Sequence, residues 1–151
     1  MSPLNSSFDP DVERAYRWFV SFQSAEEWSA RKQSIEAALQ ASWQSADSSR
    51  WDIEFFRQVC PQDRFGWYLY VIETALYEPA NNEVNENARL SPVFRRLGED
   101  LALLQKIGGI EQKVKHLLTP KTQPDQVLFE MLVALLWARN GYEIVEFVTE
   151  S

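Results

Sequence analysis

The sequence predicts a mainly α-helical fold: a bundle-like domain of about six or seven helices with one short strand at the C-terminus. Apolar residues recur at spacings of three and four along most of the chain, which is the pattern of amphipathic helices. Long stretches consist of Ala, Leu, Glu, Gln, Lys and Arg, the better helix formers. Only five glycines are present, too few for a turn-rich all-β fold. At 151 residues, we expect residues 1–151 to form a single helical domain.

The first two expected helices have strong start signals. Asp9 and Pro10 suit the cap and first position of a helix that covers residues 10–22. Ser24 and Glu27 have the spacing of a capping box, in which each side chain binds the backbone N–H of the other residue. This box begins a second helix, which we expect to end near residue 44.

The middle of the chain is rich in aromatic residues. Apolar spacing predicts a third helix over residues 51–60 and a fourth from Pro61 through Leu76. An extended alternative exists for residues 65–72, which are rich in aromatic and β-branched residues. We prefer the helix because the helical apolar spacing continues as far as Leu76.

Residues 79–90 are the most loop-like stretch, with a proline and four asparagines, and we expect a loop or subdomain boundary there. Beyond it, Ser91-Pro92 predicts a helix through residue 107, which Gly108-Gly109 would end. A short helix over residues 110–118 and a last helix over residues 124–140 are predicted next. Residues 142–148 alternate acidic and apolar side chains and predict the strand.

The net charge of −7 argues against non-specific binding to nucleic acid or to an anionic membrane, because both require a positive field. Residues 91–121 differ from the rest, with six basic and three acidic residues and thus a charge of +3, which leaves −10 for the other 120 residues. This basic segment could contact phosphate groups, but we favour pairing with the protein's own acidic helices. The single cysteine excludes an intrachain disulfide, and with no apolar run near the N-terminus it favours a cytoplasmic location.

A search for catalytic groups yields no complete site. The only histidine, His116, lies between lysines on a short helix, and Cys60 fits a small core residue at the end of an aromatic-rich helix. No spacing of His, Cys, Asp and Glu matches a usual zinc or di-iron site, and no glycine-rich phosphate-binding motif is present. We therefore predict no catalytic residues, no metal and no cofactor.

A partner-binding surface is the remaining candidate site. Trp67, Tyr68 and Tyr70 are either core residues or an exposed aromatic patch of the kind that marks a partner site. The candidate surface combines these aromatic residues with four basic residues: Arg95, Arg96, Lys113 and Lys115. The expected partner is another protein or a second copy of the chain, with neither nucleic acid nor membrane.

Residues 125–148 resemble the opening helix and first strand of the PD-(D/E)XK nuclease-like superfamily. The shared features are a helix with a Phe-Glu pair, Phe129-Glu130, then Gly141 and a strand of alternating acidic and apolar residues. The resemblance implies that Glu130 matches the helix glutamate that often lies near the metal in that family. The family's catalytic Asp and Glu-x-Lys follow on later strands and have no counterpart here, so the resemblance implies a chain that does not cleave DNA.

Two functions from different classes follow. The first is a non-catalytic helical protein-interaction or regulatory module, as the N-terminal part or a truncated relative of a nuclease-like protein. The alternative is a small acidic inhibitor, for example phage-encoded, that binds a basic nucleic-acid-handling protein. An enzyme without a sequence signature is the weakest hypothesis, because catalysis needs convergent titratable groups.

Overall fold

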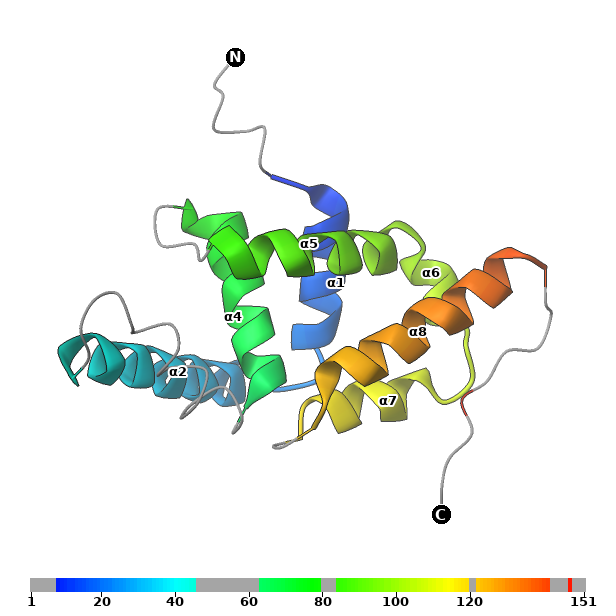
Figure 1. Cartoon of the computed structure of the whole chain (residues 1–151). Helices are drawn as coiled ribbons and strands as arrows, with labels where there is room; N and C mark the ends of the chain where they lie inside the picture. Colours follow the sequence, from blue (N-terminus) through cyan, green and yellow to red (C-terminus); the bar gives the residue numbers. More distant parts are fainter. Residues whose placement is uncertain (1–7, 46–62, 80–83, 120–121, 142–146, 148–151) are drawn as a thin grey trace.

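A computed structural model describes residues 8–45, 63–79, 84–119, 122–141 and 147. The described residues form seven helices and contain no strand, so the mainly α-helical class is confirmed (Figure 1). The helices are α1 (Pro10–Val20), α2 (Ala25–Ser45), α4 (Arg64–Tyr77), α5 (Val84–Glu99), α6 (Leu101–Leu104), α7 (Ile110–Leu117) and α8 (Pro124–Arg139).

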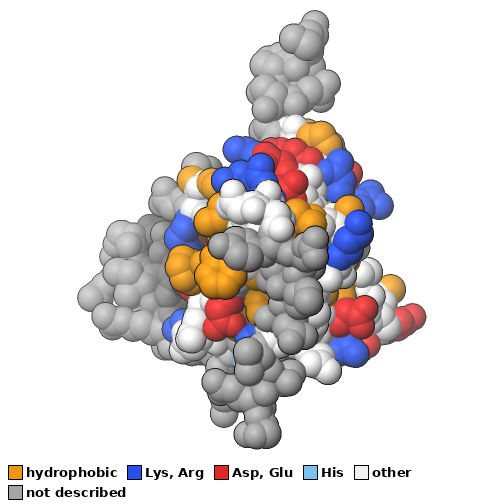
Figure 2. Space-filling model, turned by 90° about the vertical axis from the view of Figure 1, so that its right-hand side faces the viewer, with side chains coloured by type: hydrophobic (Ala, Val, Ile, Leu, Met, Phe, Trp, Pro, Cys, Tyr) orange, Lys and Arg blue, Asp and Glu red, His pale blue; other side chains and the backbone are white. Residues whose placement is uncertain are grey.

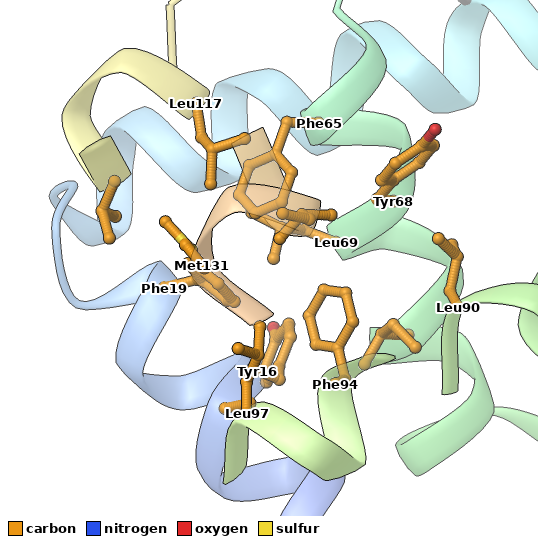
Figure 3. Close-up of a cluster of buried hydrophobic side chains, with 14 of the residues drawn as sticks. Tyr16, Phe19, Phe65, Tyr68, Leu69, Leu90, Phe94, Leu97, Leu117 and Met131 are labelled. Atoms are coloured by element: carbon orange, nitrogen blue, oxygen red, sulfur yellow. The ribbon is translucent and has the colours of Figure 1, made fainter. Parts of the chain in front are cut away.

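The core lies where α1, α4, α5, α7 and α8 converge (Figure 3). Phe19 of α1 is at its centre and is fully buried. Its ring contacts Phe65 of α4 and Phe94 of α5 edge-on, with centroids 5.1 and 5.5 Å apart. Leu117 and Met131, both fully buried, close the core from α7 and α8. Helices α1, α5 and α7 thus contribute the apolar side of an amphipathic pattern, as the sequence spacing predicts.

The predicted start signals of the first two helices are confirmed. The Asp9 carboxylate accepts hydrogen bonds from the backbone N–H groups of Asp11 and Val12, and Pro10 takes the first helical position. At α2, the N–H of Glu27 donates to Ser24 Oγ and the N–H of Ser24 donates to Glu27 Oε1, each at 3.0 Å. These bonds satisfy donors that no helical carbonyl can reach.

Helix α1 packs most extensively on α5, and Gly98 explains how closely they approach. A Cβ atom at Gly98 would collide with the backbone carbonyl of Asp11. Without one, α5 meets α1 backbone to backbone, and Arg14 donates a 3.0 Å hydrogen bond to the Gly98 carbonyl. Helix α2, in contrast, runs out from the bundle and packs mainly on α4 (Figure 1).

The prediction of a loop over residues 79–90 is wrong for its second half, because α5 begins at Val84 and not at Ser91. Leu90, Phe94 and Leu97 are buried at helical spacing and carry the helix through Pro92. A proline inside a helix leaves one carbonyl of the preceding turn without its usual donor, which is costly but tolerable when packing compensates. The buried side chains supply that compensation.

The predicted end of the 91–107 helix is also wrong, because α5 ends at Glu99 and a separate short helix, α6, follows. The helix choice for residues 65–72, the short helix at 110–118 and the last helix at 124–140 are confirmed by α4, α7 and α8. The expected helix at 51–60 lies outside the described residues, as does the expected strand at 142–148 apart from Phe147. The backbone N–H of Phe147 donates to the Gly108 carbonyl at 2.7 Å.

Candidate docking surface on helices α5 and α8

Helix α8 is apolar on two opposite sides. Val127, Leu128, Met131 and Leu135 face the core and are at most 7% exposed. The opposite side carries Phe129, Leu136 and Trp137, which are 64, 53 and 56% exposed. A helix with apolar side chains all round is normally buried on all sides. The outer side of α8 is therefore the largest departure from ordinary burial in the part of the chain that the structure describes.

A groove of about 420 Å³ runs between the outer side of α8 and α5. Its walls are almost entirely aliphatic and aromatic, and two arginines stand among them. The lining residues are Pro92, Val93, Arg96, Phe129, Leu132, Val133, Leu135, Leu136 and Arg139. Figure 2 shows one face of the molecule, on which hydrophobic side chains reach the surface beside basic and acidic ones. We call the groove between α5 and α8, together with the adjoining Trp137, the α5–α8 surface.

The charged groups beside the α5–α8 surface are held by neighbours but stay accessible. Arg139 Nε lies 3.2 Å from the Asp100 carboxylate, and Arg96 lies 3.8 Å from Glu99. The two arginine side chains remain 40 and 52% exposed. Exposed pairs of this kind contribute at most about 1 kcal/mol, so either arginine can exchange its partner at little cost. The surface thus offers an apolar floor with two exposed arginines at its edge, each beside a carboxylate.

The N-terminal end of α8 carries the exposed carboxylate of Asp125. Asp125 accepts hydrogen bonds from Tyr68 Oη at 2.7 Å and from Arg89 at 3.1 Å, yet its side chain is 64% exposed. Burial and this hydrogen bond to Asp125 raise the pKa of Tyr68 to about 12, so the phenol stays a donor at neutral pH. Asp125 lies in the first turn of α8 and Arg139 in the last, and each charge opposes the partial charge of its helix end.

Two of the three aromatic residues in the predicted partner surface lie in the interior. Trp67 and Tyr68 are 3 and 4% exposed, and Tyr70 is half-buried with its ring stacked on Trp67 at 5.9 Å. Of the two alternatives, the core location is confirmed for Trp67 and Tyr68, and the exposed patch is wrong for these two residues. The cause is that α4 is surrounded by α1, α2 and α5, so side chains on several sides of this helix are covered.

The four predicted basic residues lie at separate places. Arg95 pairs with Asp9 of α1, and Lys113 pairs with Glu130 of α8 at 2.6 Å. Of the four, only Arg96 lines the α5–α8 surface. Lys115 lines a second hollow of about 550 Å³ beside the N-terminus of α4, in which Arg31 and Asp63 bind each other through two hydrogen bonds. The preference for pairing with the protein's own acidic residues is confirmed for Arg95 and Lys113.

Glu130, the residue matched to the nuclease-like helix glutamate, is neutralised by Lys113, whose ammonium group also lies 5.3 Å from the centre of the Phe147 ring. Among the described residues, no group of three or more His, Cys, Asp and Glu side chains could hold a metal ion. No described helix is long and apolar enough to cross a membrane.

A second polar cluster joins α1, α2 and α4 around Glu73. Its carboxylate accepts hydrogen bonds from Tyr16 Oη at 2.5 Å and from Trp28 Nε1 and Lys32 Nζ, each at 3.3 Å. Burial and the neighbouring carboxylate raise the pKa of Tyr16 far above its ordinary value. The phenol therefore donates permanently, and the cluster serves to attach α2.

Sequence reasoning missed Phe129, Leu136 and Trp137 as surface residues. One signal was available: residues 127–137 are apolar on every side of the predicted helix, whereas a helix against one core needs a single apolar side. Comparison of the chain with protein family models, with curated proteins and with solved structures gave no match.

Proposed function

We propose that this chain is a non-catalytic protein-interaction module that binds an amphipathic helix of a partner on its α5–α8 surface. The observation that carries the proposal is the exposed apolar side of α8, with three large side chains more than half exposed next to an apolar groove. Exposed apolar patches of this kind mark protein interaction sites. In helix-in-groove recognition, a partner helix places apolar anchors at positions i, i+3, i+4 and i+7 in an apolar groove.

The charges at the edge of the α5–α8 surface favour a partner helix that carries carboxylates. Arg96 and Arg139 are exposed cations at the margin of an apolar floor. A partner helix with an apolar stripe and flanking carboxylates would bury the stripe and pair with both arginines. A helix flanked by lysines would meet like charges there, and the repulsion between such exposed charges costs on the order of 1 kcal/mol per pair.

The nuclease-like resemblance is compatible with this proposal. As the N-terminal part or a truncated relative of such a protein, the chain would supply α8 as a docking helix and leave catalysis to other sequence. Its single cysteine supports a reducing compartment such as the cytoplasm. We expect purified chain to leave DNA intact in Mg²⁺ or Mn²⁺; cleavage would overturn the non-catalytic assignment.

The test uses two designed helical peptides with the same leucine stripe, one flanked by glutamates and the other by lysines. Titration into ¹⁵N-labelled chain should shift amide resonances of α5 and α8 with the glutamate peptide, and at least about tenfold more weakly with the lysine peptide. Leu136→Glu should abolish the shifts, whereas Ser29→Glu on the exposed side of α2 should leave them unchanged. Absence of shifts at a concentration where the chain is monomeric, or shifts scattered over the molecule, would overturn the proposal.

A further inference from the structure

The outer side of α8 carries the spacing of a helix-pairing seam. Gln126, Phe129, Val133, Leu136 and Asn140 follow one another at steps of three, four, three and four residues. This alternation keeps side chains along one line of a helix and is the spacing with which two helices interlock. The central three residues are apolar and the two end residues carry amides, so the seam is apolar in the middle and polar at both ends.

Resting on the proposed function, we infer that the helix which occupies this surface is α8 of a second copy, packed antiparallel about a two-fold axis near Val133. A two-fold interface must be self-complementary. Two pairs of positions that are equally distant from Val133 are alike in kind and meet this requirement, and Leu136 comes opposite Glu130, which Lys113 neutralises. Phe129 comes opposite Trp137 of the second copy, and Gln126 comes opposite Asn140.

The charges at the two ends of α8 favour antiparallel packing of the two copies. Asp125 lies in the first turn and Arg139 in the last. In an antiparallel pair, each Asp125 lies at the same end as Arg139 of the second copy, and the dipoles of the two helices oppose each other. In a parallel pair, aspartate would meet aspartate and arginine would meet arginine. Both Asp125 and Arg139 are sufficiently exposed, at 64 and 40%, to reach across.

The first experiment measures the oligomeric state of the full chain by sedimentation equilibrium. The chain should be dimeric, and Leu136→Glu should raise the dimer dissociation constant by at least about tenfold, because it buries an unpaired charge. Leu136 is 53% exposed in one copy, so the variant should keep the helical circular dichroism and thermal unfolding of the parent. Ser29→Glu adds the same charge on α2 and should leave the dissociation constant unchanged. A monomeric parent chain, or equal effects of the two variants, would overturn the inference.

The second experiment determines direction. In a Cys60→Ser background, Gln126→Cys and Asn140→Cys are prepared separately, mixed and oxidised. Antiparallel pairing brings residue 126 of one copy to residue 140 of the other, so disulfides should link the two different variants. Parallel pairing would link each variant to itself, and this result would overturn the assigned geometry.

The two proposals fail in different ways. If the parent chain is monomeric but the glutamate-flanked peptide still shifts α5 and α8, the docking surface stands and the second copy is excluded as its occupant. If neither dimer nor peptide binding is found, both proposals fall.

Discussion

Asp9, the N-cap of α1, accepts hydrogen bonds from three residues, and they make its contribution to stability depend on pH. Burial raises the pKa of this carboxyl, but the hydrogen bond from Arg95 and those from the N–H groups of Asp11 and Val12 outweigh burial and lower the pKa below its ordinary value. A lowered folded-state pKa stabilises the fold above the ordinary value of 3.8, and this stabilisation is lost as pH falls through the folded pKa.

The change that tests this linkage is Asp9→Asn, which keeps a capping oxygen but removes the charge. At pH 7 the variant should be less stable than the parent in urea unfolding, and the difference should shrink steadily below pH 4. A difference that stays constant down to pH 2.5 would show that the charge of Asp9 contributes nothing.

Gly98 decides how closely α1 and α5 approach. Gly98→Ala should gain about 1 kcal/mol of helix propensity. The new methyl group meets the Asp11 carbonyl, a backbone atom that cannot rotate away, and displacing α1 should cost about 3 kcal/mol. We expect a net destabilisation of about 2 kcal/mol in the urea-derived free energy of unfolding. Ser29→Ala on exposed α2 should change it by less than about 0.5 kcal/mol; a Gly98→Ala chain as stable as the parent would disprove the close crossing.

At the scale of the element, α2 depends on Glu73 for its attachment. Glu73→Ala leaves the buried Tyr16 hydroxyl and Trp28 indole N–H without their acceptor, which should destabilise the fold by about 2 kcal/mol. Glu73→Gln retains an acceptor oxygen and should cost less. In the Glu73→Ala variant, amide hydrogen exchange should accelerate more in α2 than in α1 or α5. Glu36→Ala, on the exposed side of α2, is the control, and equal effects of the two alanine variants would refute the role of the cluster.

Most helices were predictable from the sequence because their signals are local. Asp9 accepts hydrogen bonds from the N–H groups of Asp11 and Val12, and Ser24 and Glu27 bind each other's backbone N–H groups. These bonds lie within one turn, so sequence spacing is sufficient to find them. The beginning of α5 was not predictable in this way. Asparagines and Pro92 weaken the local preference for helix, and Leu90 and Phe94 overcome it through burial against helices distant in sequence.

The candidate site was less predictable than the fold. Whether Trp67 or Phe129 is buried depends on which helices cover α4 and α8, and amphipathic spacing alone does not contain this arrangement. Only the excess of apolar residues around α8 pointed to a second apolar side of this helix.

On the scale of the whole molecule, net charge opposes association of two copies. Each chain carries −7, so two copies repel over a distance comparable to the screening length. Raising NaCl from about 50 to about 500 mM should screen this repulsion and tighten the dimer several-fold, as measured by sedimentation. The Asp125–Arg139 pairs are screened too, but exposed pairs contribute at most about 1 kcal/mol. Dissociation at high salt would indicate an interface held by charges and would contradict this prediction.

The close crossing of α1 and α5 also has a kinetic consequence. The hydrogen bonds that accompany it join residues 84 and 86 positions apart in the chain, Arg14 to Gly98 and Arg95 to Asp9. Helical domains usually fold fast because their contacts are local, and rates fall as the mean sequence separation of contacts rises. The helices themselves can form within microseconds. Packing of α1 on α5, in contrast, requires closure of a loop that contains α2 and α4. Refolding after dilution from urea should therefore be limited by this closure, and it should be slower than in a bundle whose neighbouring helices are consecutive.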